Sequence, residues 1–263
     1  MNEMIHQDSL DSDVELSNGK YDPRNKLNDL TSKEWIPETI SVWNQKGLGA
    51  GHPDTKIERQ HPAPFSFSDV TRLIRFFTKN GQTVLDPFLG VGSTLKACVL
   101  EGRSGIGIEL NSTFVELSRE RLNTEVDDLF SKNSEITIHE GDCREILKTI
   151  ETESVDFVVT SPPYWSILKK QDHKAKQERI EKGLVSDYGD DPRDLGNIDS
   201  YEDFLDELGL IFNECGRTLK KGKYMAIIVS DFRDKSKYIM FHADLAKELE
   251  KYGLEMRGLT VLY

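Results

Sequence analysis

The sequence lacks long hydrophobic runs and is poor in cysteine. No apolar stretch approaches the ~20 residues that a membrane-spanning helix requires, and no basic start followed by an apolar segment indicates a secretory signal. The cysteines are Cys98, Cys143 and Cys215, with no C-x-x-C pair. An odd number of widely spaced cysteines without a signal predicts reduced thiols in a cytoplasmic protein, and we expect no membrane partner and no metal site.

Positive charge is also scarce. The chain of 263 residues carries a formal net charge of −12, which argues against a broad nucleic-acid-binding surface because such surfaces are usually basic. Residues 169–182 and 217–223 are locally basic, and each is either part of a local groove or a solvated face. The acidic, aperiodic start predicts a flexible acidic arm over residues 1–27, followed by a single domain over residues 28–263.

Helix and strand patterns alternate from residue 68 onward. Ser68, Asn111 and Ser200 are expected N-caps of helices, and Gly81, Gly102, Gly222 and Gly253 expected stops. Strands are expected at residues 83–88, 105–110, 135–142, 155–160, 225–232 and 254–263, with those at 83–88 and 155–160 buried. Strands separated by helices predict an α/β fold with a doubly wound, mostly parallel, Rossmann-like sheet.

Polar motifs follow the carboxyl ends of the expected strands, where ligands bind in such sheets. Gly90-x-Gly92 lies between a strand and a helix, but it is neither G-x-G-x-x-G nor followed by G-K-[ST], which argues against dinucleotide and Walker-type phosphate sites. Glu109 could accept hydrogen bonds from two ribose hydroxyls, and Asp142 from an adenine amino group. An adenosyl ligand with a carboxylate-bearing tail fits these groups; the alternative for each acid is a helix N-terminal charge.

Three segments carry a family resemblance: HPAPF (residues 61–65), DPFLGVGST (residues 86–94) and VTSPPY (residues 159–164). They resemble motifs of the S-adenosylmethionine-dependent DNA amino-methyltransferases, which have the class I methyltransferase fold. The resemblance implies that Glu109 holds the ribose and that Asp142 and Cys143 lie near the adenine. His61 is then a cofactor residue, or else a simple loop histidine. The resemblance also implies which residues surround the methionine part of S-adenosylmethionine: Asp86, Phe88, Gly90, Gly92 and Thr94, together with His61 and Ala63.

The motif Ser161-Pro162-Pro163-Tyr164 is the expected catalytic corner. The Ser161 hydroxyl and the Pro162 carbonyl can accept hydrogen bonds from an exocyclic base amine, the prolines fix the backbone, and Tyr164 can stack on the base. Trp165 is either a second wall of the base pocket or a packed core residue. Family members with Thr-Ser-Pro-Pro-Tyr are mostly assigned to cytosine N4, so that target is favoured, with adenine N6 as the alternative.

The expected partner is double-stranded DNA, whose target base must be flipped out of the helix. A polar insertion over residues 166–200 is a candidate DNA contact, through Lys169, Lys170, Lys174 and Lys176. A cognate restriction endonuclease is a further expected partner. The sequence shows no candidate for the C-terminal strand that usually completes the sheet of this family. The chain is therefore expected to be either a fragment or a shortened enzyme that a partner completes. The alternatives are a methyltransferase acting on RNA or on a protein glutamine amide, or a truncated, catalytically silent DNA- or cofactor-binding module.

Overall fold

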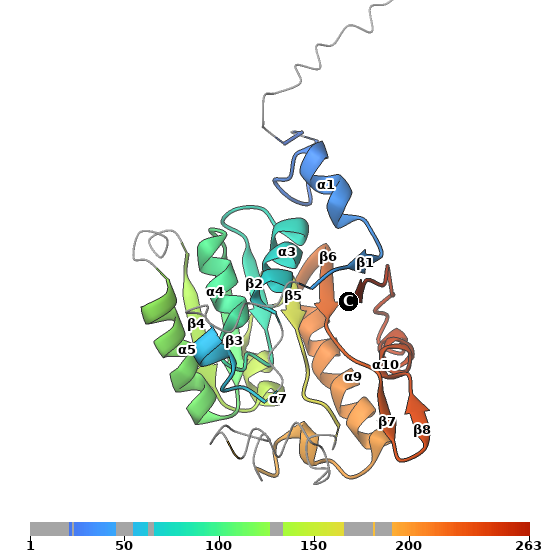
Figure 1. Ribbon diagram of the computed structural model, residues 1–263. Helices are drawn as coiled ribbons and strands as arrows, with labels where there is room; N and C mark the ends of the chain where they lie inside the picture. The colour runs from blue at the N-terminus through green and yellow to red at the C-terminus, as the bar shows by residue number, and fades with distance from the viewer. Residues whose placement is uncertain are drawn as a thin grey trace, which may run out of the picture.

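The computed structural model describes residues 21–22, 24–45, 55–62, 66–126, 134–165, 181 and 191–263. Its centre is a parallel sheet with the strand order β4-β3-β2-β5-β6 (Figure 1). The order reverses between β2 and β5, so consecutive crossovers wind in two directions from the middle of the sheet. This confirms the predicted doubly wound, Rossmann-like α/β fold. The strands are β2 (Thr83–Asp86), β3 (Ser104–Glu109), β4 (Ile136–Glu140), β5 (Val155–Thr160) and β6 (Leu219–Ile227).

Helices cover both faces of this sheet. Successive strand residues point to opposite faces: Val84 packs with α3 and α4, whereas Leu85 packs with α7, η1, α9 and α10. Helix α5 lies beside α4 at the β3–β4 end (Figure 1). The helices are α3 (Phe67–Phe77), α4 (Ser93–Leu100), α5 (Ser112–Glu125), α7 (Cys143–Ile146), η1 (Leu147–Thr149), α9 (Tyr201–Thr218) and α10 (Phe241–Glu250), with α1 (Ser32–Glu38), α2 (Thr55–Glu58) and η3 (Leu195–Asn197) outside these layers.

Two of the three predicted N-caps are confirmed. The Asn111 side chain accepts a hydrogen bond from the Thr113 amide at 2.9 Å, and the Ser200 hydroxyl accepts one from the Asp203 amide at 3.1 Å. Ser68 is not a cap, because α3 already begins at Phe67 with Ser66 in the N-cap position. The expectation that a glycine ends α9 was also wrong. The helix ends at Thr218, and Gly222 lies within β6 at φ +74°, where the pairing of β5 with β6 shifts register.

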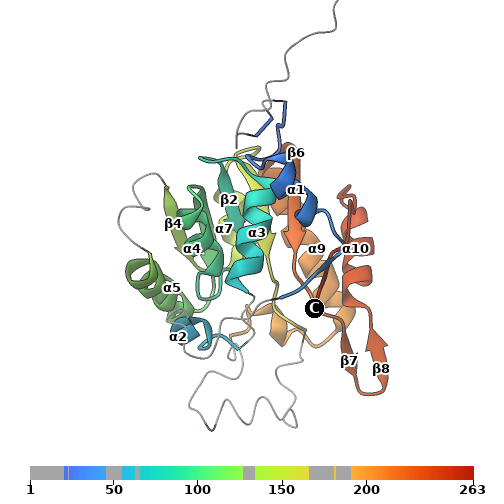
Figure 2. The same cartoon turned by 45° about the horizontal axis from the view of Figure 1, so that its top comes forward.

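The C-terminal region differs most from the sequence-based expectation. The predicted strand over residues 225–232 begins earlier, as β6, and is followed by an antiparallel hairpin of β7 (Phe232–Asp234) and β8 (Lys237–Ile239). The predicted sixth strand over residues 254–263 does not join the main sheet. Within it only β9 (Val261–Leu262) is a strand, and it pairs in parallel with β1 (Val42–Trp43), which lies far away in the sequence (Figure 2). Most side chains from Leu254 onward are exposed, so this segment lacks the burial of a central strand.

Several expectations concern residues outside the described ranges. These are most of the acidic arm, Ala63, the four insertion lysines and most of the insertion itself. The end of the insertion, residues 191–200, is described and contains η3. None of the helices in the described ranges is long and apolar enough to cross a bilayer.

Candidate active site

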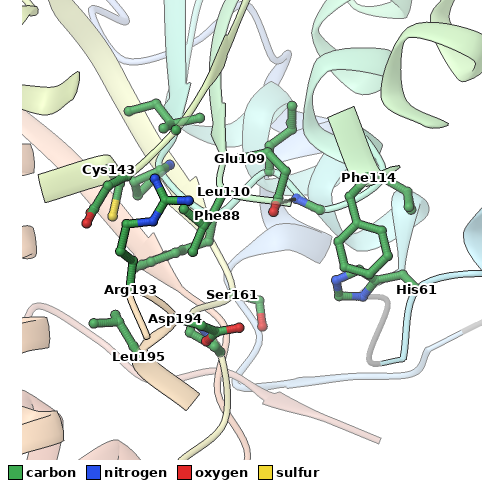
Figure 3. Close-up of a pocket in the computed structure, with 18 of the residues that line it drawn as sticks. His61, Phe88, Glu109, Leu110, Phe114, Cys143, Ser161, Arg193, Asp194 and Leu195 are labelled. Atoms are coloured by element: carbon green, nitrogen blue, oxygen red, sulfur yellow. Dashed lines mark hydrogen bonds between the residues drawn. The ribbon is translucent and has the colours of Figure 1, made fainter. Parts of the chain in front are cut away.

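A cavity opens at the carboxyl ends of β2, β3 and β5, where the strand order reverses (Figure 3). The empty space in it, with open solvent at its mouth included, is about 780 Å³. Eight of the residues singled out in the sequence line it: His61, Phe88, Gly90, Glu109, Asp142, Cys143, Ser161 and Pro163. The structure therefore brings the two main motifs to one place.

The glycine turn between β2 and α4 forms one wall. Gly90 has φ +56°, and a Cβ atom placed there would lie 3.2 Å from Nε2 of His61. Gly92 has φ +83°, and a Cβ there would lie 3.1 Å from the Ser118 side chain. Both conformations favour glycine. The turn therefore packs closely against His61 on one side and against Ser118 of α5 on the other.

A buried arginine fastens this wall to two helices. Arg121 on α5 has no exposed surface, and its guanidinium donates to the Ser93 hydroxyl at 2.8 Å. It also forms ion pairs with Glu58 of α2 at 3.1 Å and with Glu125 at 2.9 Å. Because α2 directly precedes His61, the arginine links the glycine turn to the segment that carries this histidine. The His61 ring rests on Phe114, with ring centroids 4.8 Å apart.

Glu109 is the acid at the end of β3. One carboxylate oxygen accepts a hydrogen bond from the Gly90 amide at 2.8 Å and the other from the Asn111 amide at 2.7 Å. Burial raises the pKa of Glu109 to about 7, against the lowering effect of these two bonds. The carboxylate thus joins the ends of β2 and β3, and its protonation changes close to neutral pH.

Asp142 behaves as a helix N-cap as well as a cavity residue. Its side chain accepts from the Arg144 amide at 2.9 Å and forms an ion pair with the Arg144 guanidinium at 2.7 Å. Burial would raise the pKa of Asp142, but the hydrogen bonds from Arg144 outweigh it and hold the pKa below its usual value. Asp142 is therefore ionised and oriented. Burial raises the pKa of the adjacent Cys143 thiol to about 12, so that thiol is an uncharged wall.

Asp86 has no exposed surface and does not line the cavity. It accepts hydrogen bonds from the hydroxyls of Thr94 and Thr160, each at 2.5 Å, and from the Phe88 amide at 3.0 Å. Burial raises the pKa of Asp86 to about 6. The acid therefore ties the glycine turn to the end of β5. Thr94 and Gly92 likewise do not line the cavity.

The residues after β5 divide between cavity and core. Ser161 and Pro163 line the cavity, whereas Pro162 is buried and Tyr164 is half-buried. Trp165 packs against Tyr201 with ring centroids 5.3 Å apart, and its indole N–H donates to the Ile198 carbonyl at 3.0 Å. Of the two roles expected for Trp165, this arrangement corresponds to the packed core residue.

Sequence reasoning missed the cavity residues that come from the end of the insertion, Arg193, Asp194 and Leu195. The only local signal was the Asp194-x-Gly196 pattern, which is typical of a side-chain-capped turn. It also missed Phe114, which lines the cavity from α5. Within the described ranges, no group of three or more His, Cys, Asp and Glu side chains is arranged to hold a metal ion.

The fold and this cavity define a Rossmann-like protein whose candidate site lies at the switch point of the sheet. A family model described as DNA methylase, of the N6/N4 type, matches residues 6–120 and 155–260. The chain belongs to this family, whose cofactor is S-adenosylmethionine.

Curated relatives match part of the chain. The type II methyltransferase M.ScaI of Streptomyces caespitosus is 31% identical over 122 residues, 46% of this chain and 40% of that protein. M.MjaI of Methanocaldococcus jannaschii is 37% identical over 101 residues, 38% of this chain and 32% of that protein. The matched part is thus less than half of each relative's length.

Among solved structures, the phosphoethanolamine N-methyltransferase 2 of Haemonchus contortus, in complex with S-adenosyl-L-methionine, is similar at 18% identity and a TM-score of 0.45. The match covers 78% of this chain and 42% of that one.

Proposed function

We propose that the protein is an S-adenosylmethionine-dependent DNA methyltransferase that modifies an exocyclic amino group, with N4 of cytosine as the favoured target. The observation that carries this proposal is one shared cavity. Gly90 and Glu109, which belong to the cofactor motifs, line it together with Ser161 and Pro163 of the catalytic motif. Family membership supports the same reaction.

The cavity fits S-adenosylmethionine by its donor and acceptor chemistry. Glu109 offers carboxylate oxygens for ribose hydroxyls, and the ionised Asp142 offers acceptors for an adenine amino group. Phe88 and Leu110 supply apolar wall, and His61 with the Gly90 turn closes the side assigned to the methionine part. When bound, the cofactor supplies an electrophilic methyl group on a positively charged sulfur.

The protein's own part in the reaction falls to the turn after β5. An exocyclic amine is a weak nucleophile because its lone pair is delocalised into the ring. Acceptors on its two N–H bonds, the Ser161 hydroxyl and the Pro162 carbonyl, would draw the nitrogen towards a tetrahedral shape and free that lone pair. The turn is preorganised for this task, since Thr160 is bonded to Asp86 and the prolines limit backbone freedom.

The base would reach this turn by leaving the DNA helix, because a paired amine is inaccessible. Stacking on the half-buried Tyr164 ring would offset part of the cost, since base–aromatic stacking contributes ~1–3 kcal/mol. The insertion lysines are proposed to contact the DNA backbone, and a restriction endonuclease is the proposed biological partner. The type II methyltransferase names of the relatives favour this setting.

The test is transfer of a tritiated methyl group to mixed-sequence DNA, followed by separation of the modified nucleosides. The proposal expects label in N4-methylcytosine. Label in N6-methyladenine would overturn the choice of base and keep the enzyme class. Calorimetric binding of S-adenosylmethionine without transfer to DNA would instead favour the catalytically silent module.

A further inference from the structure

Asp194 is a cavity carboxylate that the cofactor and catalytic motifs leave without a role. It lines the cavity with Ser161 and Glu109 (Figure 3), where Asp194 and Ser161 are drawn on one side and Glu109 on the other. It precedes η3, and its Oδ1 accepts a hydrogen bond from the Gly196 amide at 2.8 Å. The capped turn therefore fixes the direction of this side chain.

The turn that carries Asp194 is held from several sides. Arg144, which also binds Asp142, donates to the carbonyl of Arg193 at 2.9 Å. Asn197 donates to the Asp191 carbonyl at 2.7 Å, and the Trp165 indole binds the next residue, Ile198. The position of the carboxylate is thus set by the adenine side of the cavity and by the residue that follows the catalytic motif.

The charge of Asp194 acts on the cavity. It contributes to the raised pKa of Glu109, as Asp86 does, behind the larger effect of burial. Asp142 is neutralised by Arg144, whereas the catalytic Ser161 carries no charge. A base amine becomes positively charged as it gains a methyl group, and a neutral hydroxyl cannot balance that charge. Asp194 supplies a negative charge on the Ser161 side of the cavity.

We propose that Asp194 accepts the proton that the target amine loses. This inference rests on the proposed function. The amine nitrogen uses its lone pair to bond the methyl carbon as the carbon–sulfur bond of the donor breaks, with that electron pair going to sulfur. The nitrogen, now positive, gives one proton to the Asp194 carboxylate and becomes a neutral methylamino group. The protonated Asp194 then releases its proton to solvent.

The decisive variant is Asp194→Asn. An asparagine oxygen can still cap the Gly196 amide, because Asn and Asp are similarly good caps, so the turn should persist without the charge. The matched control is Asp199→Asn, an exposed carboxylate in the same segment that does not line the cavity. We expect Asp194→Asn to slow single-turnover methylation at saturating DNA and cofactor by about 100-fold or more, the usual scale of proton-transfer catalysis.

Two further measurements separate this role from a structural one. Calorimetry should give a cofactor dissociation constant within about threefold of wild type, since the cofactor side keeps Glu109 and Asp142. In the cofactor-free protein, carboxyl-carbon NMR should show a lower pKa for Glu109, because a like charge has been removed.

A rate for Asp194→Asn equal to that of Asp199→Asn would overturn the proposal. So would a tenfold loss of cofactor affinity with an unchanged saturated rate, which would make Asp194 a cofactor contact. If wild-type protein transfers no methyl group to any DNA, the proposed function fails and this inference fails with it. Measuring wild type beside the variants distinguishes the two failures.

Discussion

The Thr160 hydroxyl donates a 2.5 Å hydrogen bond to the buried carboxylate of Asp86. Thr160 ends β5 just before the catalytic turn, and Asp86 ends β2 just before the glycine turn. The bond therefore joins the two motifs across the centre of the sheet. Asp86, which the resemblance placed around the methionine part of the cofactor, is found beneath the cavity wall, where it holds both turns.

Thr160→Val should remove the hydrogen bond that links the two motifs while keeping the shape of the side chain. A buried acceptor loses one donor, so we expect a loss of about 1–3 kcal/mol in the free energy of unfolding. Methyl transfer should slow while cofactor affinity stays within a few-fold. Asp86→Ala should lower the free energy of unfolding further and weaken cofactor binding too. It leaves the hydroxyls of Thr94 and Thr160 and the Phe88 amide without their acceptor. Chemical denaturation measures the first effect, with the exposed Thr124→Val as control; equal stability of the two valine variants would contradict it.

Ser161→Ala and Glu109→Gln should have opposite kinetic signatures. Removing the Ser161 hydroxyl takes away an acceptor for the target amine, so single-turnover transfer should fall by about 10–100-fold with cofactor affinity preserved. Glu109→Gln places an amide N–H₂ where two backbone amides and the ribose need acceptors, so cofactor affinity should fall instead. Calorimetry and rapid-quench kinetics test the pair. Equal loss of cofactor binding in both variants would refute these assignments.

The stability of the cofactor-free protein should fall as pH rises from about 5 to 8. Burial raises the pKa of Glu109 from 4.5 to about 7 and that of Asp86 from 3.8 to about 6. The folded state therefore binds these protons more tightly than the unfolded state. The resulting stability is complete below the unfolded pKa values and is lost as pH rises through the folded ones.

Thermal unfolding without cofactor, at several pH values, measures this slope. Acids with lowered pKa values, such as Asp142 and Asp156, titrate at lower pH and do not contribute in this window. Glu109→Gln should flatten the slope. An unchanged slope in that variant would show that other groups control it.

Arg121→Met should destabilise the protein severely. The substitution leaves Glu58 and Glu125 without this buried partner, although Lys96 still pairs with Glu125 at 2.7 Å. Breaking one side of a buried ion pair typically costs about 3–5 kcal/mol. The control is Arg119→Met on the same helix, where the arginine is exposed and the expected change is within about 0.5 kcal/mol. Denaturant unfolding compares the two; a similar loss in both would contradict a special role for Arg121.

The insertion lysines provide a test on DNA affinity, which follows from the sequence. Changing Lys169, Lys170, Lys174 and Lys176 together to Glu should weaken DNA binding and make its salt dependence shallower. If each lysine contacts one phosphate, the slope of log K against log salt should change by roughly 3–4. Fluorescence anisotropy over a salt series measures this. An intact affinity and slope would exclude the insertion as a phosphate contact.

Local patterns in the sequence determined much of this protein. A largely apolar run predicted β5 at the residues where it is found, and short polar side chains marked the caps at Asn111 and Ser200. The motifs after β2 and β5 predicted a shared site, because the carboxyl ends of parallel strands meet at one edge. These features depend on neighbours in the chain, which a single sequence displays.

Long-range packing decided the rest. The pairing of β9 with β1 joins the two ends of the described chain, and no local pattern specifies a partner that distant. Asp86 and Asp142 gained their positions from Thr160 and Arg144, which only the folded chain brings to them. Asp194 came to the cavity because Arg144 and Trp165 fasten its turn there. The sequence determined which chemical groups the site could use, and the tertiary contacts determined which of them face the cavity, because burial and hydrogen-bond partners exist only after folding.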